Sequence, residues 1–343
     1  MKRILNTLFV MTQGAYLAKE GESVVVRVDG QAQKRFPVHN LAGIICFGNI
    51  GCSPFLMGHC ANNGVAVSFL TENGRFLAKA TGKTSGNVRL RREQYRRTDN
   101  DTCTTAMSRN IVLAKVANCR AVLARGIRDH GERIDRDSIH NACKKLTDIG
   151  RRLLTAKDSD RVRGLEGEAA NTYFGVLSQL TVANHDAFAF TGRSRRPPRD
   201  RMNALLSFLY VMLAHDAEAA LECSGLDPQV GFLHRERPGR ASLALDLMEE
   251  LRPVVADRLA LTLVNRQQVK PKGFTVQESG AVLMDDDTRK AVLKAYQERK
   301  RQELNHPFLQ EKTQLGMIPY TQALLLARCM RNDVSEYSPF VWR

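Results

Sequence analysis

The stretch GKTSGN, residues 82–87, divides the chain into two kinds of sequence. Its residues are small, polar or turn-forming, which is typical of a connection between folded units rather than of a helix or a strand. We therefore predict a domain boundary here, with one domain over 1–85 and a second over 86–343. The patterns on either side of this boundary predict the fold class.

Strand signals fill the part before the boundary. Runs of β-branched and apolar residues cover 23–28, 42–47, 65–70 and 75–79, and the turn dipeptides Asp29-Gly30 and Asn73-Gly74 adjoin them. Residues 54–62 fit a short helix. The first 85 residues are therefore expected to form a small β-rich domain.

Helical periodicity takes over from about Leu90. One apolar stripe comprises Ile111, Leu113, Ala114, Ala117, Ala121, Val122 and Leu123. The segment 273–284 interrupts the helices with two β-like runs around Ser279-Gly280, which predicts a small hairpin. The expected fold class is α+β, with the N-terminal β-rich domain followed by a larger, mainly α-helical domain.

The charge balance favours a polyanionic partner. The 343 residues are 43% hydrophobic and 25% charged, as in an ordinary folded protein. Lys and Arg number 51 against 36 Asp and Glu, giving a formal net charge of +15. This excess suits nucleic acid, although ribosome-associated and membrane-surface proteins share it.

The cysteines and the N-terminus indicate a reduced, cytoplasmic protein. Eight cysteines are scattered without a Cys-x-x-Cys pair, so neither a zinc knuckle nor a disulfide scaffold is expected. We interpret Cys46, Cys52 and Cys60, beside His59, as core thiols. No run of about 18 apolar residues and no cleavable leader is evident, so no membrane association is expected. The Gly82-Lys83 dipeptide is not a phosphate loop, because that loop needs glycine where Leu77 stands.

Two helical glycines flank an acid in RVRGLEGEAANTYF, residues 161–174. Gly164 and Gly167 each cost a helix about 1 kcal/mol relative to alanine. Their presence leaves the surroundings of Glu166 without side chains, which fits either a tight helix crossing or the close approach of a metal ion or a phosphate backbone.

An arginine-rich loop, RSRRPPRDR at 193–201, precedes an apolar helix pattern. The guanidinium fork of arginine suits phosphate oxygens, so this loop is either a DNA-backbone contact or a solvated basic loop. In the helix that follows, Asn203, Ser207 and Tyr210 recur at helical spacing. All three side chains are candidates for ordinary helix-to-helix hydrogen bonds.

The stretch GFLHRERPGRASLALDLMEELRP, residues 231–253, pairs a lone histidine with acids on a leucine-rich helix. Asp246, Glu249 and Glu250 fit the wet face of an amphipathic helix. Asp246 and Glu249 also share one face, and a loop would bring His234 beside them. Two carboxylates and one imidazole suit Mn²⁺ or Mg²⁺ better than a sulfur-rich zinc site does.

Taken together, these motifs resemble the CRISPR-associated Cas-one family, the integrase and endonuclease of spacer acquisition. The resemblance is carried by Gly-Leu-Glu-Gly at 164–167, Arg-Arg-Pro-Pro at 195–198 with Asn-Ala-Leu-Leu-Ser at 203–207, Gly-Phe-Leu-His at 231–234 and Leu-Asp-Leu-Met-Glu-Glu at 245–250. Stretches near the N-terminus, such as IICFGNIGCSPFLMG, look most like the type I-C branch. The resemblance covers essentially the whole chain.

The resemblance implies residue roles. Glu166, His234 and Glu249 would be the metal ligands, and Asp246 a further catalytic acid that supports the site or transiently joins it. Some relatives carry aspartate at the position of Glu249. The longer glutamate side chain can still coordinate a metal ion, with a different ligand geometry. The residues implied to contact DNA are Arg193, Arg195, Arg196, Arg199, Asn203 and Tyr210.

The resemblance also implies the chemistry and the partners. The 3′-hydroxyl of a captured double-stranded DNA would attack a phosphodiester of the CRISPR repeat, with Mg²⁺ or Mn²⁺ as cofactor. The N-terminal domain would form a homodimer, and two dimers would flank a Cas-two dimer in a hetero-hexameric complex. The alternatives are a structure-specific nuclease that acts on branched DNA in repair and a non-catalytic DNA-binding scaffold.

Overall fold

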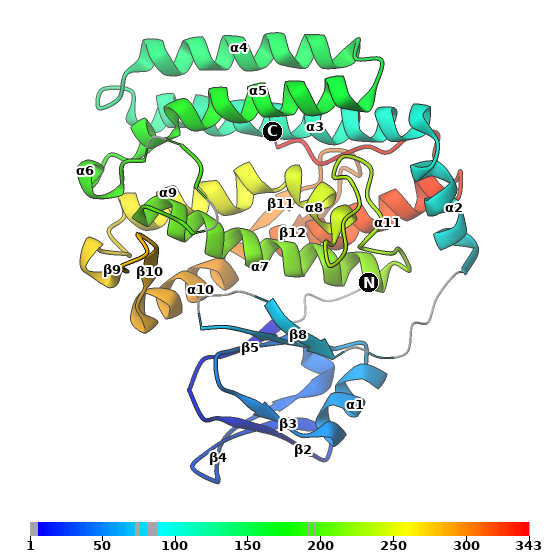
Figure 1. Ribbon diagram of the computed structural model, residues 1–343, viewed down its shortest axis with the longest axis vertical. Coiled ribbons are helices and arrows are strands. Elements are labelled where there is room, and N and C mark those ends of the chain that lie inside the picture. The colour runs from blue at the N-terminus through cyan, green and yellow to red at the C-terminus, as the bar shows by residue number, and fades with distance from the viewer. Residues whose placement is uncertain are drawn as a thin grey trace. The chain divides into compact units, whose positions relative to one another are not determined.

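The computed structural model describes residues 6–72, 76–80, 82, 88–190, 192–194 and 197–342. The chain forms two compact units, residues 1–86 and 87–343 (Figure 1). The first unit is β-rich and the second is mainly helical, so the predicted α+β class is confirmed.

The N-terminal unit contains two four-stranded sheets. One has the order β1-β5-β7-β8, in which β5 pairs in parallel with both β1 and β7, and the other has the order β4-β3-β2-β6. Its elements are β1 (Asn6–Val10), β2 (Tyr16–Glu20), β3 (Ser23–Val28), β4 (Gln31–Pro37), β5 (Leu41–Phe47), β6 (Gly51–Cys52), α1 (Pro54–Asn62), β7 (Ala66–Leu70) and β8 (Phe76–Ala80).

Local sequence explains the α1 connection between β5 and β7. The Ser53 hydroxyl accepts a hydrogen bond from the Leu56 N–H at 3.2 Å, and Pro54 occupies the first turn, where its missing N–H costs nothing. Leu56 and Cys60 then face the apolar core of this unit. Burial raises the pKa of the Cys60 thiol to about 11, consistent with a core thiol.

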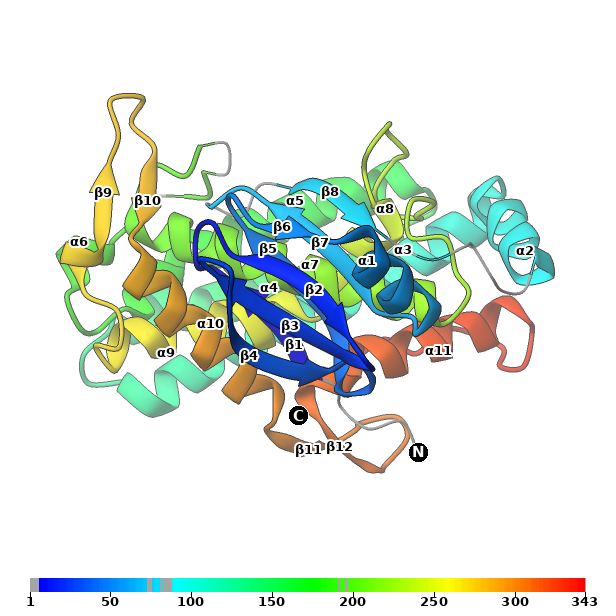
Figure 2. The same cartoon turned by 90° about the horizontal axis from the view of Figure 1, so that it is seen from below.

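The C-terminal unit is built from ten helices and two short hairpins within the described residues. Its helices are α2 (Val88–Thr98), α3 (Asp101–His130), α4 (Arg136–Leu154), α5 (Ser159–Leu177), α6 (His185–Phe188), α7 (Arg201–Cys223), α8 (Ser242–Glu249), α9 (Arg258–Asn265), α10 (Asp286–Lys300) and α11 (Ile318–Met330). The hairpins are β9 (Phe274–Val276) with β10 (Val282–Met284), and β11 (Glu303–Asn305) with β12 (Lys312–Gln314). Figure 2 shows the first hairpin as a long projection.

Two long helices, α3 and α7, organise the packing of this unit. Helices α3, α4 and α5 lie side by side, and α7 packs against α8 and α11 (Figure 1). By length and composition alone α7 could cross a membrane, but 61% of its apolar window is buried inside the fold, as in the core helix of a folded domain.

A π-helical turn, Pro253–Asp257, separates α8 from α9. Such turns often occur at functional sites.

The C-terminal segment is fastened to the core by a buried acid. Glu250 is fully buried and accepts hydrogen bonds from the Tyr337 hydroxyl and the Phe340 N–H. Asn118 of α3 donates to the carbonyls of Glu250 at 2.6 Å and Phe340 at 2.8 Å, and it accepts from the Trp342 N–H. The end of the chain is therefore part of the helical core.

We predict that Tyr337→Phe lowers the free energy of unfolding by about 1–3 kcal/mol, because fully buried Glu250 loses a hydrogen-bond donor. Chemical denaturation of the purified protein measures the effect. Tyr16→Phe, at a tyrosine that is 45% exposed, serves as the control and should change stability little. Equal stability of Tyr337→Phe and the unmodified protein would contradict the anchoring role.

Candidate functional site

The loop between α7 and α8 positions His234. Asp246 of α8 is fully buried, and its Oδ2 accepts hydrogen bonds from the Phe232 N–H at 2.6 Å and the Leu233 N–H at 3.0 Å. Its Oδ1 accepts from the His234 N–H at 2.9 Å and lies 2.7 Å from the His234 Nδ1. Asp246 thus folds the loop back onto α8 and fixes the direction of the imidazole.

Close contact with α8 also requires the glycine that begins the motif. A Cβ atom at Gly231 would lie 2.7 Å from the carbonyl carbon of Ser242 and 2.8 Å from the Asp246 Oδ2. The other end of the loop is held by buried Gln94 of α2, whose amide donates to the carbonyls of Asp227 at 2.7 Å and Val230 at 2.8 Å. The loop is therefore anchored from two helices.

The structure brings Glu166, His234 and Glu249 together. The Nε2 atom of His234 faces the Oε1 of Glu249 at 3.8 Å. Lys115 of α3 places its ammonium between the two glutamates, 2.6 Å from the Oε2 of Glu249 and in contact with the Oε1 of Glu166. Glu249 is 2% exposed, whereas the side chain of Glu166 is 28% exposed, so the cluster opens to solvent on the α5 side.

Charge compensation dominates the electrostatics of this cluster. Burial opposes the ionisation of Glu249, but the charges of Arg252 and Lys115, with His234 beside them, outweigh it and hold its pKa well below the ordinary value. Burial likewise opposes the charge on Lys115, yet Glu249 and Glu166 raise the pKa of that amine. Glu249 and Lys115 are therefore both charged, because each buried charge has a counter-ion beside it.

Arg252 belongs to a second part of the same network. Its guanidinium contacts the Oε1 of Glu249 and stacks on the Tyr210 ring, 4.2 Å from the ring centroid. The hydroxyls of Tyr210 and Tyr173 both donate to Asp257, at 2.6 and 3.0 Å. The π-helical turn thus joins α5 and α7 through one buried carboxylate.

The two glycines beside Glu166 face open space. Apart from the chain neighbours and the backbone of α5 itself, no described atom lies within 4 Å of the position that a Cβ would take at Gly164 or at Gly167. The interpretation of these glycines as a tight helix crossing is therefore wrong within the described structure. The other interpretation, room for a ligand to approach Glu166, agrees with the geometry.

The arginine loop has an internal role that the sequence prediction lacked. Arg193 donates to the Oδ1 of Asn203 at 2.5 Å and to the Ser207 hydroxyl at 3.1 Å, and it lies 4.9 Å from the Tyr210 ring centroid. Asn203 is fully buried, with its amide donating to the Gly192 carbonyl and the Asp200 carboxylate.

The predicted DNA contacts therefore need correction. The side chains of Asn203 and Tyr210, 0% and 8% exposed, are committed to hydrogen bonds inside the fold and do not offer a surface to DNA. They brace Arg193 and Arg252 instead. Arg199 is exposed, as a backbone contact requires, whereas Arg195 and Arg196 lie outside the described residues.

Lys115, Arg252 and Asp257 were missed by the sequence prediction of the site. The sequence signal for Lys115 was its place as a single lysine within the apolar helical stripe, four residues after Ile111. In the structure it is buried, as its neighbours are. Arg252 stands three residues after Glu249, the spacing of an ion pair along a helix. Asp257 carried no recognisable sequence signal, because tertiary packing alone brings it to the tyrosines.

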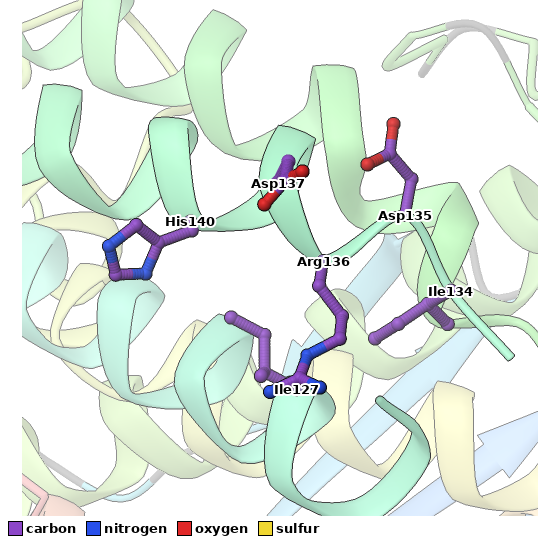
Figure 3. A pocket seen from close by; sticks show the side chains of 6 residues that line it. All are labelled: Ile127, Ile134, Asp135, Arg136, Asp137 and His140. Atoms are coloured by element: carbon purple, nitrogen blue, oxygen red, sulfur yellow. The ribbon is translucent and has the colours of Figure 1, made fainter. Parts of the chain in front are cut away.

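A hollow elsewhere on the unit lacks a convergent arrangement. It lies beside the start of α4, where Asp135, Asp137 and His140 point in different directions (Figure 3). Within the described residues, no group of three or more carboxylate, imidazole or thiol side chains is arranged so that it could hold a metal ion. Between Glu166 and Glu249, the position that a shared cation would occupy holds the Lys115 ammonium.

Solved structures share this fold. A CAS1 protein from Thermotoga maritima superposes with a TM-score of 0.81 at 22% identity, covering 95% of this chain and 97% of the other. A casposase bound to integration product gives 0.83 at 21% identity over 99% and 95% of the two chains. A Cas6-RT-Cas1–Cas2 complex gives 0.82 at 21% identity over 98% of this chain and 36% of that one.

Sequence comparison gives the family. The CRISPR-associated endonuclease Cas1 1 of Chlorobaculum tepidum is 53% identical over 343 residues, and the endonuclease Cas1 2 of Rhodospirillum rubrum is 49% identical over 347 residues, with both chains fully covered in each case. The family model described as CRISPR associated protein Cas1 matches residues 8–298. With this match across most of its length, the chain belongs to the Cas1 family.

Proposed function

We propose that this chain is a metal-dependent DNA integrase and endonuclease of CRISPR adaptation, which joins the 3′-hydroxyl ends of short captured DNA to the CRISPR repeat. The observation that carries the proposal is a cluster beneath an open helix face, in which Glu166 and Glu249 share the Lys115 ammonium and the His234 Nε2 lies 3.8 Å from the Oε1 of Glu249. Relatives named CRISPR-associated endonucleases, and a casposase bound to its integration product with the same fold, support it.

The donor set fits a hard divalent cation. Two carboxylates and one imidazole suit Mg²⁺ or Mn²⁺, and the Lys115 ammonium between the carboxylates marks where positive charge is needed. Glu166, His234 and Glu249 would hold the ion, which when bound supplies Lewis-acid polarisation of a phosphodiester and stabilises charge on the transferring group. Asp246 is a positioning residue, because both of its oxygens already hold the loop and the imidazole.

The chain's own residues prepare the site for a DNA strand. Asp246 holds His234 with Nε2 toward Glu249, and Arg252 keeps Glu249 ionised in a buried position. Gly164 and Gly167 leave the approach to Glu166 clear. Arg199, and Arg195 and Arg196 of the same loop, would contact the phosphate backbone.

The proposed assembly extends beyond this chain. We expect a homodimer formed through the N-terminal unit and a hetero-hexamer with a dimer of the small Cas2 protein, acting in the cytoplasm on captured double-stranded DNA and the CRISPR repeat. The family resemblance supports this, as does the shared fold with a chain of the Cas6-RT-Cas1–Cas2 complex. Within the family, the N-terminal motifs favour the type I-C branch.

One observation favours a second candidate function, a DNA-binding scaffold without catalysis. Glu249 is already neutralised by Lys115 and Arg252, so the acids would serve stability alone in such a protein. The scaffold predicts DNA binding that no divalent metal ion alters. A nuclease for branched DNA differs again, since it would yield nicked or shortened strands without joined product.

The deciding measurement is strand transfer of a labelled 3′-hydroxyl duplex into a plasmid carrying the CRISPR repeat, with Cas2 present. We predict joined product with Mn²⁺ or Mg²⁺ and none with EDTA. Glu166→Gln and His234→Ala should each reduce joining by about 100-fold or more, because each removes a ligand to the charge-stabilising ion. Their DNA affinity should stay within about twofold of the unmodified protein, since neither replacement removes a positive phosphate contact.

The products distinguish the alternatives. Cleavage without joining would favour the branched-DNA nuclease, and metal-independent binding without reaction would favour the scaffold. Full joining by Glu166→Gln would contradict the assignment of the site itself. Asp287→Asn, at an exposed acid of α10, serves as the matched control and should leave joining unchanged.

Arg199 tests the proposed backbone contact. We predict that Arg199→Ser weakens DNA binding and lowers the slope of log affinity against log salt by about 1, as expected for one lost phosphate contact. Fluorescence anisotropy over a series of salt concentrations measures both values. Arg151→Ser, at an exposed arginine of α4, is the control; an unchanged slope in Arg199→Ser would remove this residue from the interface.

Replacing Gly164 and Gly167 should have opposite effects on stability and on strand transfer. Gly164→Ala and Gly167→Ala each place a methyl group in open space on a helix, so each should raise the free energy of unfolding by about 0.5–1 kcal/mol. Strand transfer should nevertheless fall in the double variant, because the methyl groups narrow the approach to Glu166. Gly175→Ala, on the same helix and equally open, should stabilise without loss of joining. Undiminished joining by the double variant would contradict the approach route.

A further inference from the structure

Lys115 occupies an unusual position for a lysine. Its side chain is 8% exposed, and its ammonium lies 2.6 Å from the Oε2 of Glu249 while contacting the Oε1 of Glu166. The two carboxylates come from different helices, α5 and α8, and Lys115 comes from a third, α3. A single ammonium therefore joins three helices at the centre of the site.

The ammonium stands where a metal ion would be expected. A cation that binds Glu166 and Glu249 together must lie between their oxygens, and that space holds the Lys115 Nζ. The ammonium and a divalent cation cannot both occupy the space between these two oxygens, because their atoms would overlap and their charges would repel each other in a poorly solvated site. Lysine and metal are thus alternatives at this position.

The side chains differ in their ability to leave. The Arg252 guanidinium makes two contacts, an ion pair with Glu249 and stacking on Tyr210, which together fix its position. Lys115 carries its charge on a flexible four-carbon stem. Glu166 is 28% exposed, so the ammonium has a route toward solvent along the open face of α5.

We propose that Lys115 is the built-in counter-ion of the metal-free site, and that a divalent cation binds by displacing its ammonium from between Glu166 and Glu249. The inference rests on the proposed function, since it takes the same three residues as ligands. It has two consequences. Lys115 keeps the metal-free protein folded by pairing buried acids, and it lowers the affinity for the metal by competing for those acids.

The test is Mn²⁺ binding to the full-length protein, followed by the loss of the free-ion signal in electron paramagnetic resonance. Lys115→Met and Lys115→Gln should bind Mn²⁺ roughly tenfold more tightly than the unmodified protein, or about 1.4 kcal/mol. Their melting temperatures without metal should fall, and the rise on adding Mn²⁺ should exceed that of the unmodified protein.

Lys300 provides the matched control. Its side chain is also 8% exposed, and its ammonium pairs with Asp216 at 2.8 Å. Lys300→Met should therefore destabilise the protein by a similar mechanism while leaving the Mn²⁺ affinity unchanged. Tighter binding in this variant as well would overturn the proposal, because the effect would then follow from loss of stability rather than from competition.

The outcomes separate this proposal from the proposed function. One outcome would overturn the displacement but leave the metal site standing. In it, both Lys115 variants bind Mn²⁺ no more tightly than the unmodified protein does, and Glu166→Gln does not bind Mn²⁺. Failure of every protein to bind Mn²⁺ would overturn both. Tighter binding by the Lys115 variants that also requires Glu166 supports both.

A measurement on the unmodified protein avoids any folding defect of the variants. Acetic anhydride labels exposed lysines, and mass spectrometry of the digested protein gives the extent at each position. Labelling of Lys115 should rise severalfold on saturation with Mn²⁺, while that of Lys300 stays low. Unchanged labelling of Lys115 at saturating Mn²⁺ would overturn the proposal.

Discussion

The helical unit depends on one constraint, the need to neutralise charges that are buried in its core. Glu249 is 2% exposed and ionised, and an isolated carboxylate there would cost several kcal/mol. Lys115 and Arg252 supply the compensating charges from α3 and from the turn after α8. Because the partners come from different helices, the ion cluster fixes how those helices meet, and the apolar packing around it has little freedom to choose another arrangement.

The same constraint extends outward through uncharged groups. Arg252 lies against the Tyr210 ring, and the hydroxyls of Tyr210 and Tyr173 meet on Asp257 at the π-helical turn. Asp246, one turn before Glu249, uses both oxygens to hold the histidine loop. The acids of α8 and the residue that caps it therefore have separate roles: Asp246 positions the histidine loop, Glu249 faces the Lys115 ammonium, and Glu250 anchors the C-terminal segment.

Elements determined by local signals could be predicted from the sequence. The β-branched run of β3 and its following Asp29-Gly30 turn gave the strand its bounds, and the Ser53 cap with Pro54 gave α1 its start. Strand β4 could not be predicted, because its residues are polar and largely exposed, so pairing with β3 alone makes it a strand.

The sequence pointed to the acids and the histidine of this cluster but not to its cations. The family resemblance, rather than spacing, joined Glu166 to His234 and Glu249, which lie far along the chain, and the structure brings the three side chains together. Lys115 could not be foreseen, since a lysine among apolar residues gives no indication of its partners. Side chains such as Asn203 show the opposite error, where a polar residue that looked suited to DNA satisfies the fold itself.

In the proposed metal site, carboxylates that are both buried and ionised have to be compensated when no metal is bound. Distant surface cations would not suffice, because water and salt screen them over about 8–10 Å. Adjacent fixed cations alone would hold the carboxylates permanently and exclude a metal. The pairing of one fixed guanidinium, stacked on Tyr210, with one ammonium on a flexible stem answers both requirements. The identity of these two cations, arginine at 252 and lysine at 115, follows from what each must do.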